Sequence, residues 1–316
     1  MSWIKTRGMT AMTNPFGDGV AFIDDDYCPV AEARIPLLDW GFLRSDANQD
    51  TVTVWKGLFF RLEDHLDRFQ RNLGKLRMTC PYGRDEQREI LMELARRLDR
   101  PDAYVQMIGT RGRPPVGVRD PRACENRYYA FCIPYMSIAT PEARARGLHL
   151  VVSDICRVPP ESVDPTVKHY HWLDFEMGLF QAYDRGGETV VLVDHDGNLT
   201  EGPGFNIFRV KDGRLETPAG GVLDGMTRKT VFELCAETNV DCRLTTLPAD
   251  SLTASDEVFL SSSAGGIMPV TTVDGRRIGD GAPGPLTARL DRLYWSKRET
   301  GWHGTPVGFR RDAATH

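Results

Sequence analysis

One lysine in this chain stands in surroundings that suit covalent chemistry. Seven of its 39 Lys and Arg residues are lysines, and six of these lie elsewhere in turns, helices and termini. Lys168 instead lies within Asp164–Trp172, among β-branched and aromatic residues and away from any run of charge. A lysine withdrawn from water favours its neutral amine, a nucleophile that forms Schiff bases with carbonyl compounds. The non-catalytic alternative, which the pattern alone favours, is a surface lysine whose aliphatic stem packs on apolar neighbours.

Two further segments suggest how a charged, ring-shaped ligand would be held. Glu201 lies in a glycine-flanked turn, where the backbone can approach a ligand closely and the carboxylate can keep a heteroaromatic nitrogen protonated. The stretch Gly225–Lys229 opens a helix, and a helix N-terminus that follows a glycine suits a phosphate group. The ordinary interpretations are a solvated turn residue for Glu201 and a simple threonine cap for Thr227.

Two more groups could complete an anion site. Ser261–Gly266 is rich in hydroxyl and amide donors and follows a predicted strand. Arg68 lies on a predicted helix and could reach an anion, although its default role is to pair with Asp64 four residues earlier. Each of these signals is weak by itself, and only their combination in one chain points to a single site.

Composition and missing motifs exclude several other classes of protein. A net charge of -5 argues against a nucleic-acid groove, and no apolar run reaches membrane-spanning length. Seven scattered cysteines without CxxC spacing favour reduced thiols over a zinc site or a disulfide framework. Met1–Pro15 has no apolar stretch typical of a signal peptide, so we expect a cytoplasmic protein. No nucleophile elbow, P-loop, zinc-protease or dinucleotide-binding motif is present.

The pattern of apolar residues predicts two α+β domains with a cleft between them. Residues 1–134 form a smaller N-terminal domain that begins with an extended arm, 135–147 a linker, and 148–316 a larger C-terminal domain. Leucines and a phenylalanine at spacings of three and four predict a helix over 62–76, and a similar pattern predicts a second helix over 85–98. Further helices are expected over 173–183 and from about residue 227. Strands are expected at 19–23, 51–55, 104–109, 128–133, 148–153, 189–193, 206–210 and 257–260.

In ordered segments from about Ala21 to Trp295, the chain resembles the class IV aminotransferases, which use pyridoxal 5'-phosphate and have fold type IV. The segments that carry the resemblance are 34–42, 60–68, 164–172, 199–206, 225–229 and 262–269. The resemblance implies the two-domain fold of D-amino-acid aminotransferases and a homodimer. Lys168 would form the Schiff base and act as general base, and Glu201 would pair with the pyridine nitrogen. The other cofactor-binding residues by motif position are Arg68, Phe205, Asn206, Met226, Thr227 and Ser262.

Within this family the chain looks most like the (R)-selective amine transaminases, which move an amino group from an amine or D-amino acid to a keto acid such as pyruvate. The substrate positions implied by this likeness are Arg44, Gln49, Tyr104, Gln106, Trp172, Ser263 and Ala264. Arg44, Gln49 and Gln106 depart from the subgroup, which usually has His, Tyr and Glu there. We expect a more polar and more cationic pocket, suited to a substrate with a carboxylate or other polar tail. Arg119, in the loop 111–122, is a further candidate for binding the acceptor's carboxylate.

Three other functions remain open at this point. One is a branched-chain L-amino-acid aminotransferase, and another is a lyase related to aminodeoxychorismate lyase that uses the same cofactor. The third is a binding protein that has lost catalysis. Retention of Lys168, Glu201, Arg68 and Thr227 together argues against that last possibility, because a chain drifting from catalysis has no reason to keep all four.

Overall fold

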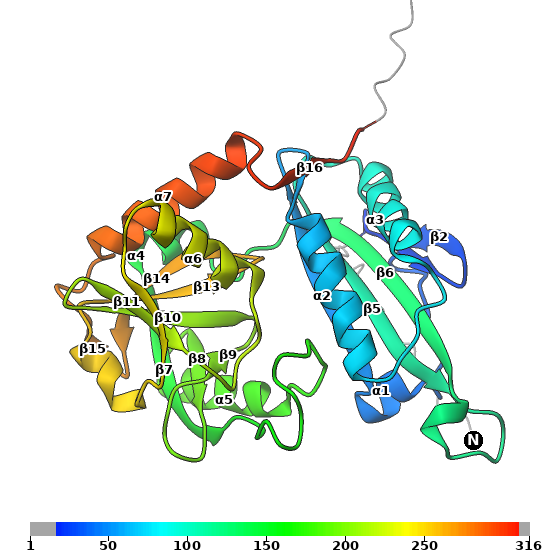
Figure 1. Ribbon diagram of the computed structural model, residues 1–316, viewed down its shortest axis with the longest axis horizontal. Coiled ribbons are helices and arrows are strands. Elements are labelled where there is room, and N and C mark those ends of the chain that lie inside the picture. Colours follow the sequence, from blue (N-terminus) through cyan, green and yellow to red (C-terminus); the bar gives the residue numbers. More distant parts are fainter. Residues whose placement is uncertain (1–16, 310–316) are drawn as a thin grey trace, which may run out of the picture.

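The computed structural model describes residues 17–309, which form two lobes, each built around one β-sheet (Figure 1). The predicted N-terminal arm over 1–15 lies outside the described residues. The first sheet has seven strands in the order β16-β4-β3-β5-β6-β1-β2. The second sheet has nine strands, and its main path runs β12-β11-β10-β13-β14-β7-β8. The expected α+β architecture with two lobes is therefore present.

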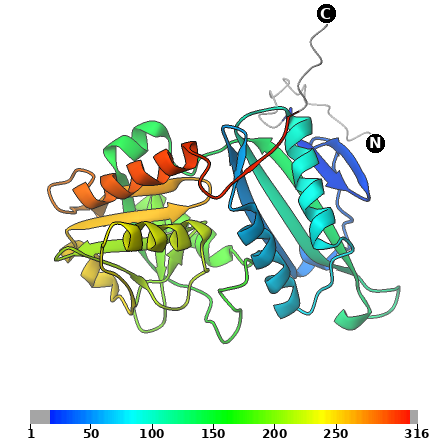
Figure 2. The same cartoon turned by 45° about the horizontal axis from the view of Figure 1, so that its top comes forward.

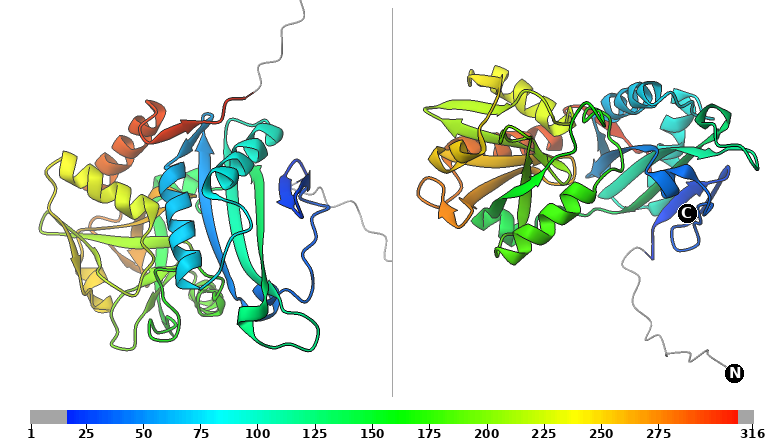
Figure 3. Two further views of the ribbon diagram at one scale, coloured as in Figure 1. Left: turned by 45° about the vertical axis from the view of Figure 1, so that its right-hand side comes forward. Right: turned by 90° about the horizontal axis from the view of Figure 1, so that it is seen from below.

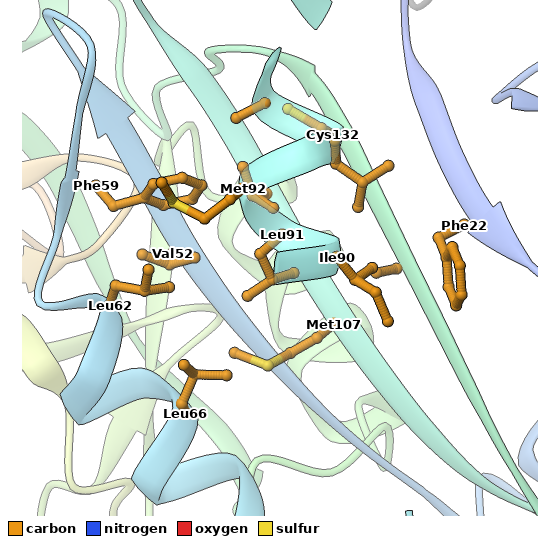
Figure 4. Packing of buried hydrophobic residues seen from close by; sticks show 14 of the residues in the cluster. Phe22, Val52, Phe59, Leu62, Leu66, Ile90, Leu91, Met92, Met107 and Cys132 are labelled. Atoms are coloured by element: carbon orange, nitrogen blue, oxygen red, sulfur yellow. The ribbon is translucent and has the colours of Figure 1, made fainter. Parts of the chain in front are cut away.

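The first lobe packs two helices against its sheet. Its elements are β1 (Val20–Ile23), β2 (Asp26–Pro29), α1 (Trp40–Arg44), β3 (Ala47–Trp55), β4 (Leu58–Phe60), α2 (Leu62–Lys75), α3 (Arg84–Leu98), β5 (Ala103–Arg113) and β6 (Glu125–Pro134). The apolar stripe of α2 is buried through Leu62, Leu66, Phe69 and Leu73, as the spacing predicts. These side chains meet Val52 and other sheet residues in one continuous core (Figure 4).

The second lobe has helices on its sheet as well. Its elements are α4 (Pro141–Arg146), β7 (Leu148–Cys156), α5 (Leu173–Asp184), β8 (Thr189–Val193), β9 (Glu201–Gly202), β10 (Phe205–Lys211), β11 (Arg214–Pro218), α6 (Met226–Glu237), β12 (Cys242–Thr245), β13 (Glu257–Ser262), β14 (Gly266–Val273), β15 (Arg276–Arg277) and α7 (Pro285–Glu299). Successive strand residues face opposite sides, so Ile207 and Phe208 enter two separate cores. In Figure 2, α6 (yellow) and α7 (orange to red) lie along the strands of this sheet.

The C-terminal strand corrects the predicted domain boundaries. The expected C-terminal domain runs from 148 to 316, but β16 (Gly304–Pro306) pairs antiparallel with β4 in the first sheet. Figure 3, left, shows this red strand beside the blue strands of the first lobe. Val307 is fully buried in the core of that lobe, and this burial explains why the chain returns. The predicted linker 135–147 also contains α4, whose Ala143 packs into the core of the second lobe.

No helix within 17–309 has the length and apolar content needed to cross a membrane. In the same range no group of three or more His, Cys, Asp or Glu side chains could hold a metal ion. All seven cysteines are free.

Candidate active site

A cavity of about 410 Å³ lies where the two lobes meet. The first lobe contributes Gln49 and Thr51 from β3, Arg68 from α2 and Tyr104 from β5. The second lobe contributes the lysine segment, the turn between β9 and β10, the start of α6 and the end of β13. Its charged side chains are Arg68, Arg157, Lys168 and Glu201, with His169 as a further titratable group.

Lys168 lies at the centre of this arrangement and is held by its backbone. The backbone amide of Gln49 donates to the carbonyl oxygen of Lys168 over 2.9 Å, and Asn48 and His169 form an isolated β-bridge. The lysine segment is therefore docked on strand β3 of the other lobe. Burial and the nearby Arg68 charge lower the pKa of the Lys168 amine to about 8. A sizeable fraction of the amine is then neutral, and nucleophilic, near physiological pH.

This pKa predicts the pH dependence of labelling. In protein freed of any carbonyl ligand, the rate at which Lys168 captures a small aldehyde should be half-maximal near pH 8. The neutral amine accumulates as the pH rises through the pKa. An ordinary lysine is half neutral only at about pH 10.4. Reductive trapping followed by peptide mass spectrometry at each pH measures this rate. Labelling of Lys168 that rises only with that of the exposed lysines would contradict the assignment.

Glu201 also lines the cavity and is almost fully buried. Its Oε2 accepts a hydrogen bond of 2.8 Å from the backbone amide of Leu223, and Arg157 Nη2 lies 3.5 Å from its Oε1. Burial raises the pKa of Glu201, while the charges of Arg157 and Lys168 and the Leu223 amide oppose that rise. Gly204, with a φ of +83°, closes the turn that follows and places Phe205 and Asn206 on the cavity wall.

Arg68 is fixed by a buried carboxylate that the sequence did not reveal. Its Nε and Nη2 each donate to Asp50 over 2.7 Å, and its Nη1 donates to the carbonyl oxygen of Asp224 in the other lobe over 2.8 Å. Asp50 is fully buried. Burial alone would raise its pKa, but the Arg68 charge and hydrogen bonds hold that pKa well below its ordinary value. Burial lowers the pKa of His65, which we therefore take as a neutral ring donating from Nδ1 to Asp50 over 2.7 Å.

Removing the Asp50 carboxylate should destabilise the whole fold. Asp50→Ala is expected to lower the free energy of unfolding by about 3–5 kcal/mol, because Arg68 would be left buried without its counter-charge. Urea unfolding followed by circular dichroism measures this loss. The matched control is Asp67→Ala, which removes an exposed partner of Arg84 and should cost less than about 1 kcal/mol. Equal losses in the two variants would show that the Arg68 pair has no special role.

The start of α6 has the features of an anion cradle. Thr227 and Ser261 both line the cavity, and the hydroxyl oxygen of each is buried without a hydrogen-bond partner among residues 17–309. Gly225 precedes α6, and a Cβ there would come within 2.0 Å of Asn206 Oδ1, so only glycine fits. The backbone amides at this helix end and the unpaired hydroxyls offer donors that an anionic group would satisfy.

Most of the predicted site residues meet in this one cavity. The predicted residues that line it are Lys168, Arg68, Glu201, Phe205, Asn206, Met226, Thr227, Ser262, Gln49, Tyr104, Trp172, Ser263 and Ala264. Ser262 lines it, but its hydroxyl already donates to the carbonyl oxygen of Gly204 over 2.7 Å, whereas Ser261 has the unused hydroxyl.

Three predicted residues lie away from the cavity of their own chain. Arg44 is exposed at the end of α1, with its guanidinium 3.3 Å above the Trp40 ring. Arg44 does not line the cavity of its own chain, so the expectation that it makes the pocket more cationic stays a prediction. Gln106 lies behind Tyr104 and bonds to it over 3.0 Å, and Arg119 is exposed in a loop that contributes nothing to the cavity.

Comparison with known proteins identifies the family to which this fold and site belong. A family model described as Amino-transferase class IV matches residues 49–273, well over half of the chain. The chain is 29% identical over 276 residues to a putative branched-chain-amino-acid aminotransferase of Methanocaldococcus jannaschii, covering 86% of this chain and 94% of that one. It is also 29% identical over 239 residues to the branched-chain-amino-acid aminotransferase of Escherichia coli K12, covering 75% and 77%.

Solved structures show the same fold. The crystal structure of the Escherichia coli branched-chain amino acid aminotransferase superimposes with a TM-score of 0.85 at 24% identity, covering 92% of this chain and 99% of that chain. The enzyme of Thermoproteus uzoniensis with norvaline gives a TM-score of 0.82 at 25% identity, covering 91% and 99%. The chain belongs to the class IV aminotransferases. It is an aminotransferase that depends on pyridoxal 5'-phosphate, as the sequence predicted.

Proposed function

We propose that this aminotransferase transfers the amino group of an amino acid with a neutral, apolar side chain to a keto acid. The names of the relatives support a substrate of the branched-chain type. The observation that carries the proposal is the charge of the cavity wall. Its charged side chains are Arg68, Arg157, Lys168 and Glu201, and we assign all four to holding or supporting the cofactor. Apart from His169, the remaining lining side chains are neutral, and Thr51 Oγ1 among them lies 3.2 Å from the Tyr104 hydroxyl and 3.3 Å from Gln49 Oε1.

The residues present fit pyridoxal phosphate. The unpaired hydroxyls of Thr227 and Ser261, the free amides at the start of α6 and the Arg68 guanidinium are donors for its phosphate. Glu201 offers a carboxylate for its ring nitrogen, and Lys168 offers the amine that bonds it. Ser262 also lines the cavity, but its hydroxyl hydrogen is already donated to the Gly204 carbonyl, so Ser261 is the better hydroxyl donor.

Each protein group then has a defined task in transamination. When bound, pyridoxal phosphate supplies an electron sink that stabilises negative charge at the substrate's α carbon. Lys168 holds the cofactor and, once displaced by substrate, its neutral amine carries the α proton. Glu201 keeps a negative charge beside the ring nitrogen, and Arg68, held in turn by Asp50, balances the phosphate.

A second candidate function is the transamination of (R)-amines or D-amino acids. Tyr104 and Trp172 both line the cavity and form aromatic walls that suit an aryl substituent. The sequence segments that resemble the (R)-selective amine transaminases support this candidate as well. The two candidates differ in the substrate's handedness and in its need for a carboxylate.

A donor panel separates the candidates. L-Leucine, L-valine, L-aspartate, D-alanine and both enantiomers of an arylalkylamine are each assayed with pyruvate and with 2-oxoglutarate as acceptors. We expect kcat/KM for the branched-chain amino acids to exceed that for L-aspartate by at least about 10-fold, because the neutral wall offers an acidic side chain no counter-charge. Preference for one arylalkylamine enantiomer over every amino acid would establish the second candidate instead, and equal use of L-aspartate would contradict the neutral wall.

We also propose a cytoplasmic homodimer. The segment before and within α1 exposes several large apolar side chains, and so does α5: Ile35, Leu37, Leu38, Phe42, Leu43, Leu173, Met177, Phe180 and Tyr183. Figure 1 shows α1 and α5 at the same lower end of the two lobes. A second copy covering these side chains would explain their exposure. Light scattering on the purified protein tests the dimer, and a monomer at micromolar concentration would contradict it.

The proposed cytoplasmic location rests on the cysteines. All seven are free, which is typical of proteins in a reducing compartment.

A further inference from the structure

Arg157 lies next to Glu201 on the cavity wall, and several contacts hold its side chain in place. It follows strand β7 and is 5% exposed. Its Nη1 donates to Asp174 Oδ2 over 2.7 Å, its Nη2 lies 3.5 Å from Glu201 Oε1, and its guanidinium carbon lies 4.1 Å from the centre of the Phe175 ring. Two acceptors and an aromatic face therefore define the orientation of the guanidinium.

The buried carboxylate of Glu201 depends on a nearby positive charge. Burial raises the pKa of Glu201, and Arg157 is the strongest influence that opposes it. Two other cations are within electrostatic range, Lys168 and Arg228. Lys168 loses its charge as the pH rises through its own pKa of about 8, whereas the Arg157 guanidinium stays charged. Arg228 is directed to other acceptors, since its Nη2 donates to the carbonyl oxygen of Pro218 over 2.6 Å.

Arg157 leaves one of its buried hydrogen-bond donors unsatisfied, which is unfavourable for a residue whose only role is structural. Its Nε is buried and has no hydrogen-bond partner within residues 17–309. The neighbouring His169 ring also has a buried, unpartnered Nε2, and the Arg157 charge, after burial, helps to lower the pKa of that ring to about 4. Unsatisfied buried donors cost stability, so a neutral side chain of similar size would suit packing alone better. The cost points to a use for the positive charge.

We propose that Arg157 is a positioning residue that holds Glu201 as a carboxylate oriented toward the cofactor's ring nitrogen. The proposal rests on the function given above, in which Glu201 faces that nitrogen. Only an ionised carboxylate can accept a hydrogen bond from a protonated ring nitrogen and balance its charge, whereas a protonated Glu201 would itself be a donor. Arg157 acts through Glu201, and the Asp174 carboxylate keeps it in place.

The test measures the ionisation of Glu201 directly. Infrared spectra of the full-length protein, loaded with pyridoxal phosphate and separately freed of it, are recorded across pH. The carboxylic acid band of Glu201 is identified by its absence in Glu201→Gln. In Arg157→Met we expect the titration of this band to move upward by about 1–2 pH units, because an opposite charge nearby lowers a carboxyl pKa by about that amount. Arg157→Lys, which restores a charge, should recover most of the shift.

Arg209→Met is the matched control. Arg209 makes a closer pair with Glu216 on neighbouring strands of the same sheet, over 2.7 Å, but contributes nothing to the cavity. This variant should leave the Glu201 titration unchanged. If Arg157→Met does not fold, Arg157→Gln preserves hydrogen bonding without charge and should give the same upward shift.

The possible outcomes separate the two proposals. An unchanged Glu201 titration in the neutral Arg157 variants would overturn the role of Arg157, and so would an equal shift in Arg209→Met. An upward shift that Arg157→Lys reverses would support it. The measurement on protein without cofactor does not depend on turnover. If the donor panel contradicted the proposed substrate class, the infrared result would still decide whether Arg157 controls the ionisation of Glu201.

Discussion

Replacing Lys168 with alanine is expected to reduce transamination by about 10³-fold or more. In the proposed mechanism the variant loses both the amine that bonds the cofactor and the base that carries the substrate's α proton, and a positioned base alone accounts for about 10²–10⁴-fold. Steady-state kinetics with the best donor from the panel measures the loss. The fold should persist, because no described side chain hydrogen-bonds to the Lys168 amine and the segment is held by its backbone through Gln49.

The control for this variant is Lys56→Ala. Lys56 is exposed in a turn and pairs with Glu299, away from the cavity. Its removal should leave kcat unchanged. Undiminished turnover in Lys168→Ala would rule out the central role of this lysine, whatever the control shows.

Replacing Glu201 with glutamine is expected to lower kcat by about 10²–10³-fold, the usual effect of removing one preorganised electrostatic partner. Glutamine has nearly the same shape and can still accept the hydrogen bond from the Leu223 amide, so the turn should keep its geometry. What disappears is the negative charge that we propose lies beside the cofactor's ring nitrogen. The visible absorbance of the bound cofactor and its pH dependence should change together with kcat.

Glu216→Gln is the corresponding control, because Glu216 pairs with Arg209 outside the cavity. It should alter neither kcat nor the absorbance. A Glu201→Gln variant with full activity and an unchanged spectrum would show that the ring nitrogen does not need this carboxylate.

The helices of the first lobe could be predicted because their apolar spacing is a local property. The stripe of Leu62, Leu66, Phe69 and Leu73 predicts α2 to within a residue of its observed ends, and α3 is equally close. Strand β3 was predicted four residues too short. Its first part contains Asn48, Gln49 and Asp50, polar residues that are buried here by contacts with the other lobe and with Arg68. Tertiary packing, not local preference, makes that part of the strand.

Pairings between distant segments could not be predicted from one sequence. Strand β16 joins the first sheet almost 250 residues after β4, and its three residues have no strong local pattern. Asp50 gives no sign in the sequence that it faces Arg68. Arg157 stands eleven residues before Lys168, and only the fold brings it to Glu201. The motif residues were found because the family resemblance supplied the three-dimensional context that spacing lacks.

The substrate positions were the weakest part of the sequence prediction. Gln49, Tyr104 and Trp172 do line the cavity, but Arg44 is turned outward from α1 in its own chain. A residue near a chain's own surface can reach a site only through a second copy, which single-chain spacing does not describe. The expected cationic tail-binding pocket therefore stays a prediction, and the single chain offers Thr51 and Tyr104, whose hydroxyls lie 3.2 Å apart.

The most direct test of the central claim is to locate the cofactor's covalent bond. The loaded enzyme is reduced with borohydride, digested, and analysed by peptide mass spectrometry. We predict a single phosphopyridoxyl group, on Lys168, in stoichiometric amount. The same modification on another lysine, such as Lys229 near the start of α6, would contradict the account.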